Sequence, residues 1–568
     1  MIQKIEKQFR KKNGITMISL IIAIIVLVVV TNVLIYSAKD NIEIDKINKM
    51  NNDIDLIEGK VNTYYLQNDA IPTVCKYINT AGINIGANDT GDFYVIDLEK
   101  LDGLTLNFGK DYYKIKEDNQ KVNELEDVYI INSESNKVYY VKGVITSNGS
   151  KKLHNDELVS DAVEVEYEEI EVSGGEWNGT LNTPMLDNGM IPIKYNGTNW
   201  EVCEVEDKDW YNYNAQEGTE AKDSKWANIM LSDGIYKSET VKVGQNVKKE
   251  ELGSMFVWIP RYAYNITEGY HSSGHGKIDI KFISTDIKSE GDILIQKENI
   301  KISNSYGNGK WNIPSAFQFA GKELPGFYIA KFEASGEAEN IKIVPGAKPL
   351  DNIDISTFFT QCIQMSSKKD NKYGITEGVI SSHMIKNSEW GAVAYLADSK
   401  YGRKGEKITI NNSSNKTGGN GTYESNTVQT TTGNITGVYD MSGGSYEYVA
   451  AYVNNTSNNI QVNGEELISN KNAKYVDVYT VANPETQTGN YDKSKSLYAD
   501  AIYETSSSES NKSAWNAEYS SFPYSDYPFF VRSGGYDNGQ VTGLFYFGRY
   551  KGIGEGHRSS RPVLSLDN

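Results

Sequence analysis

Histidines and cysteines are the side chains whose spacing would most directly indicate metal or thiol chemistry. His271 and His275 are four residues apart, which on a helix would place both imidazoles on one face, ready to bind a metal ion. Gly274 and Gly276 favour a loop at this point instead, so we assign no metal site. The cysteines have no C-x-x-C spacing, and neither a disulfide framework nor a thiolate zinc site is indicated. They are Cys75, Cys203 and Cys362.

Motifs for other kinds of catalysis are also missing from the sequence. It has no G-x-S-x-G nucleophile elbow and no G-x-x-x-x-G-K-[ST] phosphate loop. The segment Gly552-Ile-Gly-Glu-Gly556 is rich in glycine, but no helix pattern follows it. We therefore expect a binding protein rather than an enzyme, and no cofactor. Calcium binding stays an open alternative without assigned ligands, because no set of clustered Asp, Glu and Asn residues can be identified.

The composition near the carboxyl end favours binding. Roughly the last seventy residues are rich in tyrosine, serine, asparagine, glycine and aspartate. Tyrosine offers a large amphipathic contact area at low entropic cost, while the smaller residues adapt their hydrogen bonds to a ligand, as in antibody paratopes. The alternative is that these are ordinary loop residues of a tyrosine-rich surface protein.

The overall composition limits the fold and the class of protein to which these residues can belong. The chain has 568 residues, enough for several domains, and 39% of them are hydrophobic, which excludes a polytopic transporter. A net charge of -18 disfavours nucleic-acid binding, because a phosphate backbone would be repelled. With 39 tyrosines, 50 glycines and 12 prolines, the composition favours short strands joined by glycine turns.

The amino terminus has the charge pattern of an exported or anchored protein. Five basic residues lie in the first 14 residues, and residues 15–38 carry no charge. That uncharged segment is long enough, as a helix, to cross ~30 Å of hydrocarbon. The basic flank predicts that residues 1–14 stay in the cytoplasm. A plain single-pass signal anchor would explain this pattern.

The segment KKNGITMISLIIAIIVLVVV also resembles the leader of type IV prepilins and pseudopilins. This resemblance implies that a prepilin peptidase cuts after Gly14 and methylates Ile15, and it makes other pilins candidate partners. The family usually has Glu at the fifth mature position, where this chain has Ser19. Filament assembly is therefore less strongly indicated than processing.

Residues 39–146 are predicted to form a small pilin-like domain. Apolar residues recur at alternating steps of three and four, which places them on one face of an amphipathic helix. They are Ile47, Met50, Ile54, Ile57, Val61 and Tyr64. Further on, Asp127–Asn132 and Lys137–Lys142 flank a turn-prone segment and predict a β-hairpin. Residues 147–183, which are rich in Gly, Ser, Asn and Glu, are predicted to be a linker.

Residues 184–568 consist mainly of short β-like runs separated by Gly, Asn and Ser, with helix patterns at 353–365 and 388–397. Several motifs in this region resemble, in order, the formylglycine-generating-enzyme (sulfatase-modifying factor) superfamily, whose fold is a variant of the C-type lectin fold. They are Gly326–Glu333, Ser388–Trp390, Gly437–Val449, Arg532–Gly535 and Arg561–Leu564. The catalytic members need a late cysteine pair or a histidine cluster, and this chain has neither.

The fold class predicted from these observations is α+β. An N-terminal transmembrane or pilin helix with a small β-sheet domain precedes a large C-type-lectin-like domain of many short strands and few helices.

The end of the chain further resembles the variable region of lectin-fold receptors diversified by retroelements. That resemblance implies an apolar skeleton and an exposed set of ligand-binding residues. The implied ligand-binding residues are Tyr536, Asp537, Asn538, Gln540, Arg549, Tyr550, Lys551, Glu555 and His557.

Together these patterns predict an adhesin or minor pilin of the cell envelope, held in the membrane or in a pilus by residues 15–38. Its large C-terminal domain would be extracellular and would bind a protein or a glycan. Two alternatives stay open: a tethered oxidase of the formylglycine-generating type, and a structural pseudopilin.

Overall fold

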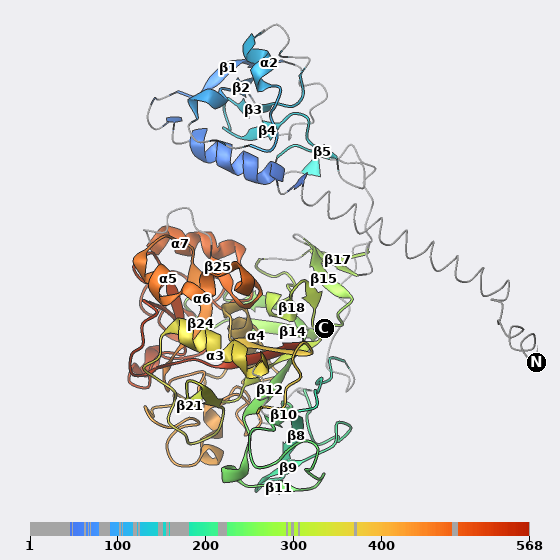
Figure 1. The fold of residues 1–568 in the computed structure, drawn as a ribbon, viewed down its shortest axis with the longest axis vertical. Helices are drawn as coiled ribbons and strands as arrows, with labels where there is room; N and C mark the ends of the chain where they lie inside the picture. Colours follow the sequence, from blue (N-terminus) through green and yellow to red (C-terminus); the bar gives the residue numbers. More distant parts are fainter. Residues whose placement is uncertain are drawn as a thin grey trace, which may run out of the picture. The chain divides into compact units, whose positions relative to one another are not determined.

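The computed structural model describes residues 46–159 and 181–566, apart from gaps of which the longest are 79–90, 214–223 and 480–486. The chain forms two units, Met1–Glu166 and Tyr167–Asn568. Figure 1 shows that β-strands make up most of the regular structure in the second unit.

The first unit packs a helix that includes residues 49–61 against a four-stranded antiparallel sheet, in the order β1-β2-β3-β4. Met50, Ile54, Ile57 and Val61 are buried, as the spacing of three and four predicts. The predicted hairpin is confirmed, because β3 and β4 pair directly. The strands are β1 (Thr73–Tyr77), β2 (Phe93–Ile96), β3 (Tyr129–Asn132), β4 (Val138–Tyr140), β5 (Val144–Ile145), β6 (Lys151–Lys152) and β7 (Leu158–Val159), with helix α2 at Tyr112–Glu117.

The second unit is built on an eight-stranded sheet with the order β11-β9-β8-β10-β12-β20-β29-β23. The last strand of the chain, β29, lies between β20 and β23, so the carboxyl end completes this sheet. The strands are β8 (Met190–Tyr195), β9 (Trp200–Val202), β10 (Asn228–Leu231), β11 (Asn246–Val247), β12 (Met255–Pro260), β20 (Gly326–Ala330), β23 (Ile380–Met384) and β29 (Pro562–Leu566).

A second, five-stranded sheet carries most of the carboxyl-terminal sequence. Its order is β25-β24-β26-β27, and β28 pairs with β24 in parallel. The strands are β24 (Tyr446–Val453), β25 (Asp477–Tyr479), β26 (Phe529–Arg532), β27 (Phe547–Tyr550) and β28 (Arg558–Ser559). Smaller pairings join β13 (Tyr262–Glu268) with β14 (Lys277–Phe282), β15 (Ile287–Glu290) with β16 (Ile293–Gln296) and β17 (Ile300–Asn304), β18 (Gln318–Phe319) with β19 (Lys322–Glu323), and β21 (Ser335–Glu337) with β22 (Asn340–Lys342).

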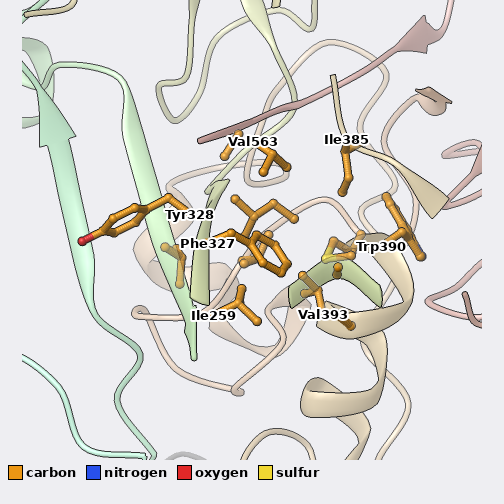
Figure 2. Close-up of a cluster of buried hydrophobic side chains, with 14 of the residues drawn as sticks. Ile259, Phe327, Tyr328, Ile385, Trp390, Val393 and Val563 are labelled. Atoms are coloured by element: carbon orange, nitrogen blue, oxygen red, sulfur yellow. The ribbon is translucent and has the colours of Figure 1, made fainter. Parts of the chain in front are cut away.

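Helices are short in this unit. They are α3 (Ile355–Ser367), α4 (Asn387–Asp398), α5 (Asn458–Asn463), α6 (Glu465–Ile468) and α7 (Gln487–Lys493). The two helices predicted from periodicity correspond to α3 and α4. All residues of α4 are buried, and Figure 2 shows Trp390 and Val393 of this helix in one buried cluster with Phe327 of strand β20. The helix therefore joins the core of the eight-stranded sheet.

The predicted α+β class with an N-terminal transmembrane or pilin helix needs correction. The described chain is mostly β-strand with few helices, because its short apolar runs are separated by Gly, Asn and Ser and pair as strands. Among the described residues, no helix is both long and apolar enough to cross a membrane, which contradicts the predicted single-pass membrane or pilus localisation in the cell envelope. Residues 15–38, on which that prediction depends, lie outside the described part of the chain.

Candidate ligand-binding face

A buried ion pair fixes the start of strand β24, next to the predicted ligand-binding residues. The guanidinium of Arg561 donates to both carboxylate oxygens of Glu447, with an Nε to Oε2 distance of 2.6 Å. Both side chains are fully buried. Gly443 and Gly444, just before the strand, have φ of 84° and 73°, which other residues adopt only with strain. This turn and ion pair fix the direction in which the neighbouring tyrosines point.

Glu447 belongs to a larger buried group of charges. Burial raises the pKa of Glu447, of Asp440 and of Glu333, and the nearby guanidinium of Arg561 opposes the shift in all three. Glu333 also accepts a hydrogen bond from the backbone N–H of Ser445 at 2.7 Å. These groups are enclosed in the core, so we interpret them as scaffold rather than as a site.

Tyrosine and arginine side chains from strands β24, β27 and β28 and from the neighbouring turns form a face. We call it the Tyr–Arg face and define it as Tyr446, Tyr536, Tyr550, Glu555, His557 and Arg558. The guanidinium carbon of Arg558 lies 3.5 Å from the ring centroid of Tyr550 and 5.3 Å from that of Tyr446. Because β28 pairs with β24 opposite Tyr446, the sheet itself brings Arg558 to this position.

Hydrogen bonds and ring contacts orient the rest of the face. Glu555 forms an ion pair with Arg558 at 3.0 Å. Burial and a hydrogen bond with Glu555 raise the pKa of Tyr550 to about 12, against the opposing effect of Arg558. The rings of Tyr536 and His557 meet edge to face with centroids 5.0 Å apart. The Tyr550 hydroxyl therefore stays protonated at neutral pH and can donate or accept a hydrogen bond.

The structure brings together most of the predicted ligand-binding residues. Tyr536, Tyr550, Glu555 and His557 are part of the Tyr–Arg face, and Asn538 reaches it through a hydrogen bond with Tyr446. The remaining two residues of the same turn, Asp537 and Gln540, are exposed.

Arg549 and Lys551 lie apart from this face. Consecutive residues of a strand point to opposite sides, so the Arg549 side chain points away from Tyr550, and Lys551 follows the end of the strand. Arg549 stacks over Tyr524 at 4.7 Å, and the ammonium of Lys551 lies 5.3 Å from the ring centroid of Tyr527. The predicted set is thus divided between two aromatic surfaces on either side of β27.

Sequence reasoning missed Arg558, the residue that connects the face. It also left Tyr446, whose side chain is partly buried, out of the predicted ligand-binding set. The signal that could have found them is the alternation Tyr446-Glu447-Tyr448 in a strand, which puts both tyrosines on the side opposite the buried acid. Nothing in the linear sequence indicates that β28 returns beside this strand.

A small pocket is lined by both acidic and basic side chains, one of which contacts the 539–541 turn. Asp398 and Glu518 line it, and Lys407 lies 3.4 Å from Glu518. Burial raises the pKa of Glu518 to about 7 and also raises that of Asp398. The ammonium of Lys407 donates to the backbone oxygen of Gln540 at 2.6 Å, which connects the pocket to the turn. The cavity measures about 10 Å³, roughly the space of one water.

The two histidines with metal-like spacing do not converge. Both lie in the turn between β13 and β14, and His271 has a positive φ of 48°. His271 stacks on Tyr503 with centroids 4.0 Å apart, whereas Nε2 of His275 lies 2.9 Å from a carboxylate oxygen of Asp398. No group of three or more metal-ligating side chains occurs among the residues with described positions.

Comparisons with known proteins give little further guidance. No family model matches the chain, and no curated protein matches its sequence, so neither the pilin resemblance nor the formylglycine-generating-enzyme resemblance is supported there. Among solved structures, the chain is similar to one described as "Major Tropism Determinant U1 Variant", with 11% identity over 67% of this chain and 74% of the other. The TM-score is 0.21, which does not define a shared fold.

No finding supports the predicted prepilin peptidase or pilin partners. Gly14 and Ile15, where processing was predicted, lie outside the described residues.

Proposed function

We propose that this chain is a ligand-binding protein that recognises a protein or a glycan through the Tyr–Arg face. The observation that carries this proposal is the position of Arg558, which stacks on Tyr550 and Tyr446. Tyrosines held in place before binding lose little entropy when a ligand arrives, and tyrosine and arginine are the residues that most often dominate binding energy.

The rim of the face provides the hydrogen bonds that a protein or glycan requires. Asp537 and His557 are exposed beside the partly exposed ring of Tyr536. Carboxylate, imidazole and phenol groups together offer both donors and acceptors. This mixture suits backbone amides and sugar hydroxyls better than a purely apolar ligand.

The proposal includes binding without chemical turnover. Burial raises the pKa of the Cys362 thiol in α3 and raises that of Cys203 to about 12. Both thiols therefore stay protonated at neutral pH and are poor nucleophiles. No cysteine follows Cys362 in the sequence.

The test is a binding screen of the full chain on a glycan microarray and on a library of displayed protein domains. For a hit, Tyr550→Ser and Tyr536→Ser should each weaken affinity about thirtyfold, which corresponds to the ~2 kcal/mol typical of a hot spot. Tyr113→Ser is the matched control, because Tyr113 is 65% exposed and lies in the first unit. Unchanged affinity in both face variants would overturn the proposal.

A further inference from the structure

A cavity lies against strands β8, β9 and β10. It measures about 180 Å³. Its walls include Tyr195, Trp200 and Trp210, and its polar lining includes Asn228, Lys225 and Asp209. These strands belong to the eight-stranded sheet, whereas the Tyr–Arg face is built on the five-stranded sheet. The cavity is therefore a separate candidate site.

Hydrogen bonds to other protein groups hold the aromatic walls in place. Because the indole N–H groups of both tryptophans are used in these bonds, they are not available to a ligand. Trp200 donates from Nε1 to the hydroxyl of Tyr423 at 2.9 Å. Trp210 donates from Nε1 to the backbone oxygen of Asn228 at 2.8 Å. The rings of Tyr195 and Trp200 meet edge to face with centroids 5.6 Å apart. The walls thus present carbon surfaces in fixed positions.

Asn228 lines the cavity, and one polar atom of its side chain has no hydrogen-bond partner among the described residues. Its side chain is 1% exposed, and its Nδ2 donates to the backbone oxygens of Trp226 and Thr436 at 2.9 and 2.8 Å. These two bonds fix the amide, and Oδ1 has no hydrogen-bond partner among the described residues. A buried acceptor without a partner is unfavourable, so this atom favours a ligand that donates a hydrogen bond.

The positive and negative charges of the side chains that line the cavity nearly cancel. Lys225 and Asp209 are both exposed and carry opposite charges. The ammonium of Lys194 is already paired with Asp207 at 2.7 Å. The cavity therefore offers both a donor and an acceptor at its rim without a net charge that would select an anion or a cation.

We propose that this cavity binds a single pyranose residue of a saccharide. A cavity of ~150 Å³ accepts a benzene ring, so one of about 180 Å³ has the size for one six-membered ring. The ring's C–H faces match the aromatic walls, and its hydroxyls both donate to Asn228 and Asp209 and accept from Lys225. A bare aromatic ring would leave the Asn228 acceptor unpaired.

The experiment is saturation-transfer-difference NMR on the full chain with glucose, galactose, mannose and N-acetylglucosamine as probes. The protons of at least one of these sugars should receive saturation from the protein and appear in the difference spectrum. Asp209→Asn combined with Lys225→Gln should weaken its binding about tenfold or more, because two hydrogen bonds to charged groups become weaker bonds to neutral amides. Tyr195→Ala should weaken it as well, by removing part of the wall.

The matched control is Glu239→Gln combined with Lys242→Gln, since both residues are exposed and neither lines the cavity. This control should bind the monosaccharide like the unaltered chain. Thermal unfolding of each variant checks that the fold is intact. Absence of signal from all four sugars, unchanged binding in the Asp209 and Lys225 variant, or preferential binding of indole or inorganic phosphate would each overturn the proposal.

Discussion

The buried carboxyl of Glu504 should make the second unit less stable as pH rises towards neutrality. Glu504 accepts hydrogen bonds from the hydroxyls of Tyr264 and Tyr395, at 2.8 and 3.0 Å, and from the backbone N–H of Ala499 at 2.7 Å. Burial nevertheless raises its pKa from 4.5 to about 7. The folded state therefore retains this proton at a pH where the unfolded chain has lost it.

The sign and size of the effect follow from this difference. A folded state that binds more protons loses stability as pH increases, here from about pH 4.5 up to about pH 7. Each pKa unit corresponds to ~1.4 kcal/mol, so the carboxyl should reduce the free energy of unfolding by about 3 kcal/mol over this range. Asp500 and Glu518, whose pKa values burial also raises to about 7, act in the same direction.

The assay compares Glu504→Gln with the unaltered chain by urea denaturation at pH 5 and pH 8. Tryptophan fluorescence reports on the second unit, because every tryptophan lies beyond residue 166. Gln cannot ionise, so the loss of stability between the two pH values should be about 3 kcal/mol smaller in the variant. The exposed Glu239→Gln serves as control and should change nothing. An identical pH dependence in Glu504→Gln and the unaltered chain would refute the reasoning.

Three further predictions concern the scaffold and are tested by the same denaturation assay, with circular dichroism for the first unit. Gly443→Ala should destabilise the second unit by ~1 to 3 kcal/mol, because a side chain is strained at its positive φ and a Cβ would overlap a neighbouring backbone oxygen. Arg561→Met should cost ~3 to 5 kcal/mol by leaving Glu447 unpaired, and adding Glu447→Leu should recover much of this loss; no recovery would contradict the ion-pair account. Asp53→Ala should destabilise the first unit by ~1 to 3 kcal/mol, because it removes the buried acceptor of the Tyr129 hydroxyl, and a neutral result would contradict that role.

Local periodicity was enough to predict several elements. The stripe from Met50 to Val61, the hairpin of β3 and β4, and helices α3 and α4 all follow from residues close in sequence. Such elements depend mainly on burying one face, which spacing alone encodes. The prediction of a helix-led α+β fold was wrong, because it gave a terminal apolar segment more weight than the many short strands.

The site was only partly predictable, for a reason of topology. Tyr536 and Tyr550 stand out by composition, but Arg558 lies beside Tyr446 only because β28 pairs with β24, more than a hundred residues earlier. The small pocket of Asp398 and Glu518 likewise joins residues that are far apart along the chain. Pairings of this kind are set by the global fold and leave no local pattern.

Hydrogen–deuterium exchange of the full chain, with and without a ligand identified on the arrays, tests the central claim most directly. The account predicts slower exchange in peptides covering residues 536–538 and 550–558 when the ligand is bound, since these segments carry the Tyr–Arg face. Peptides from the first unit should be unaffected. Slower exchange confined to other segments, with 536–538 and 550–558 unchanged, would contradict the claim that this face binds the ligand.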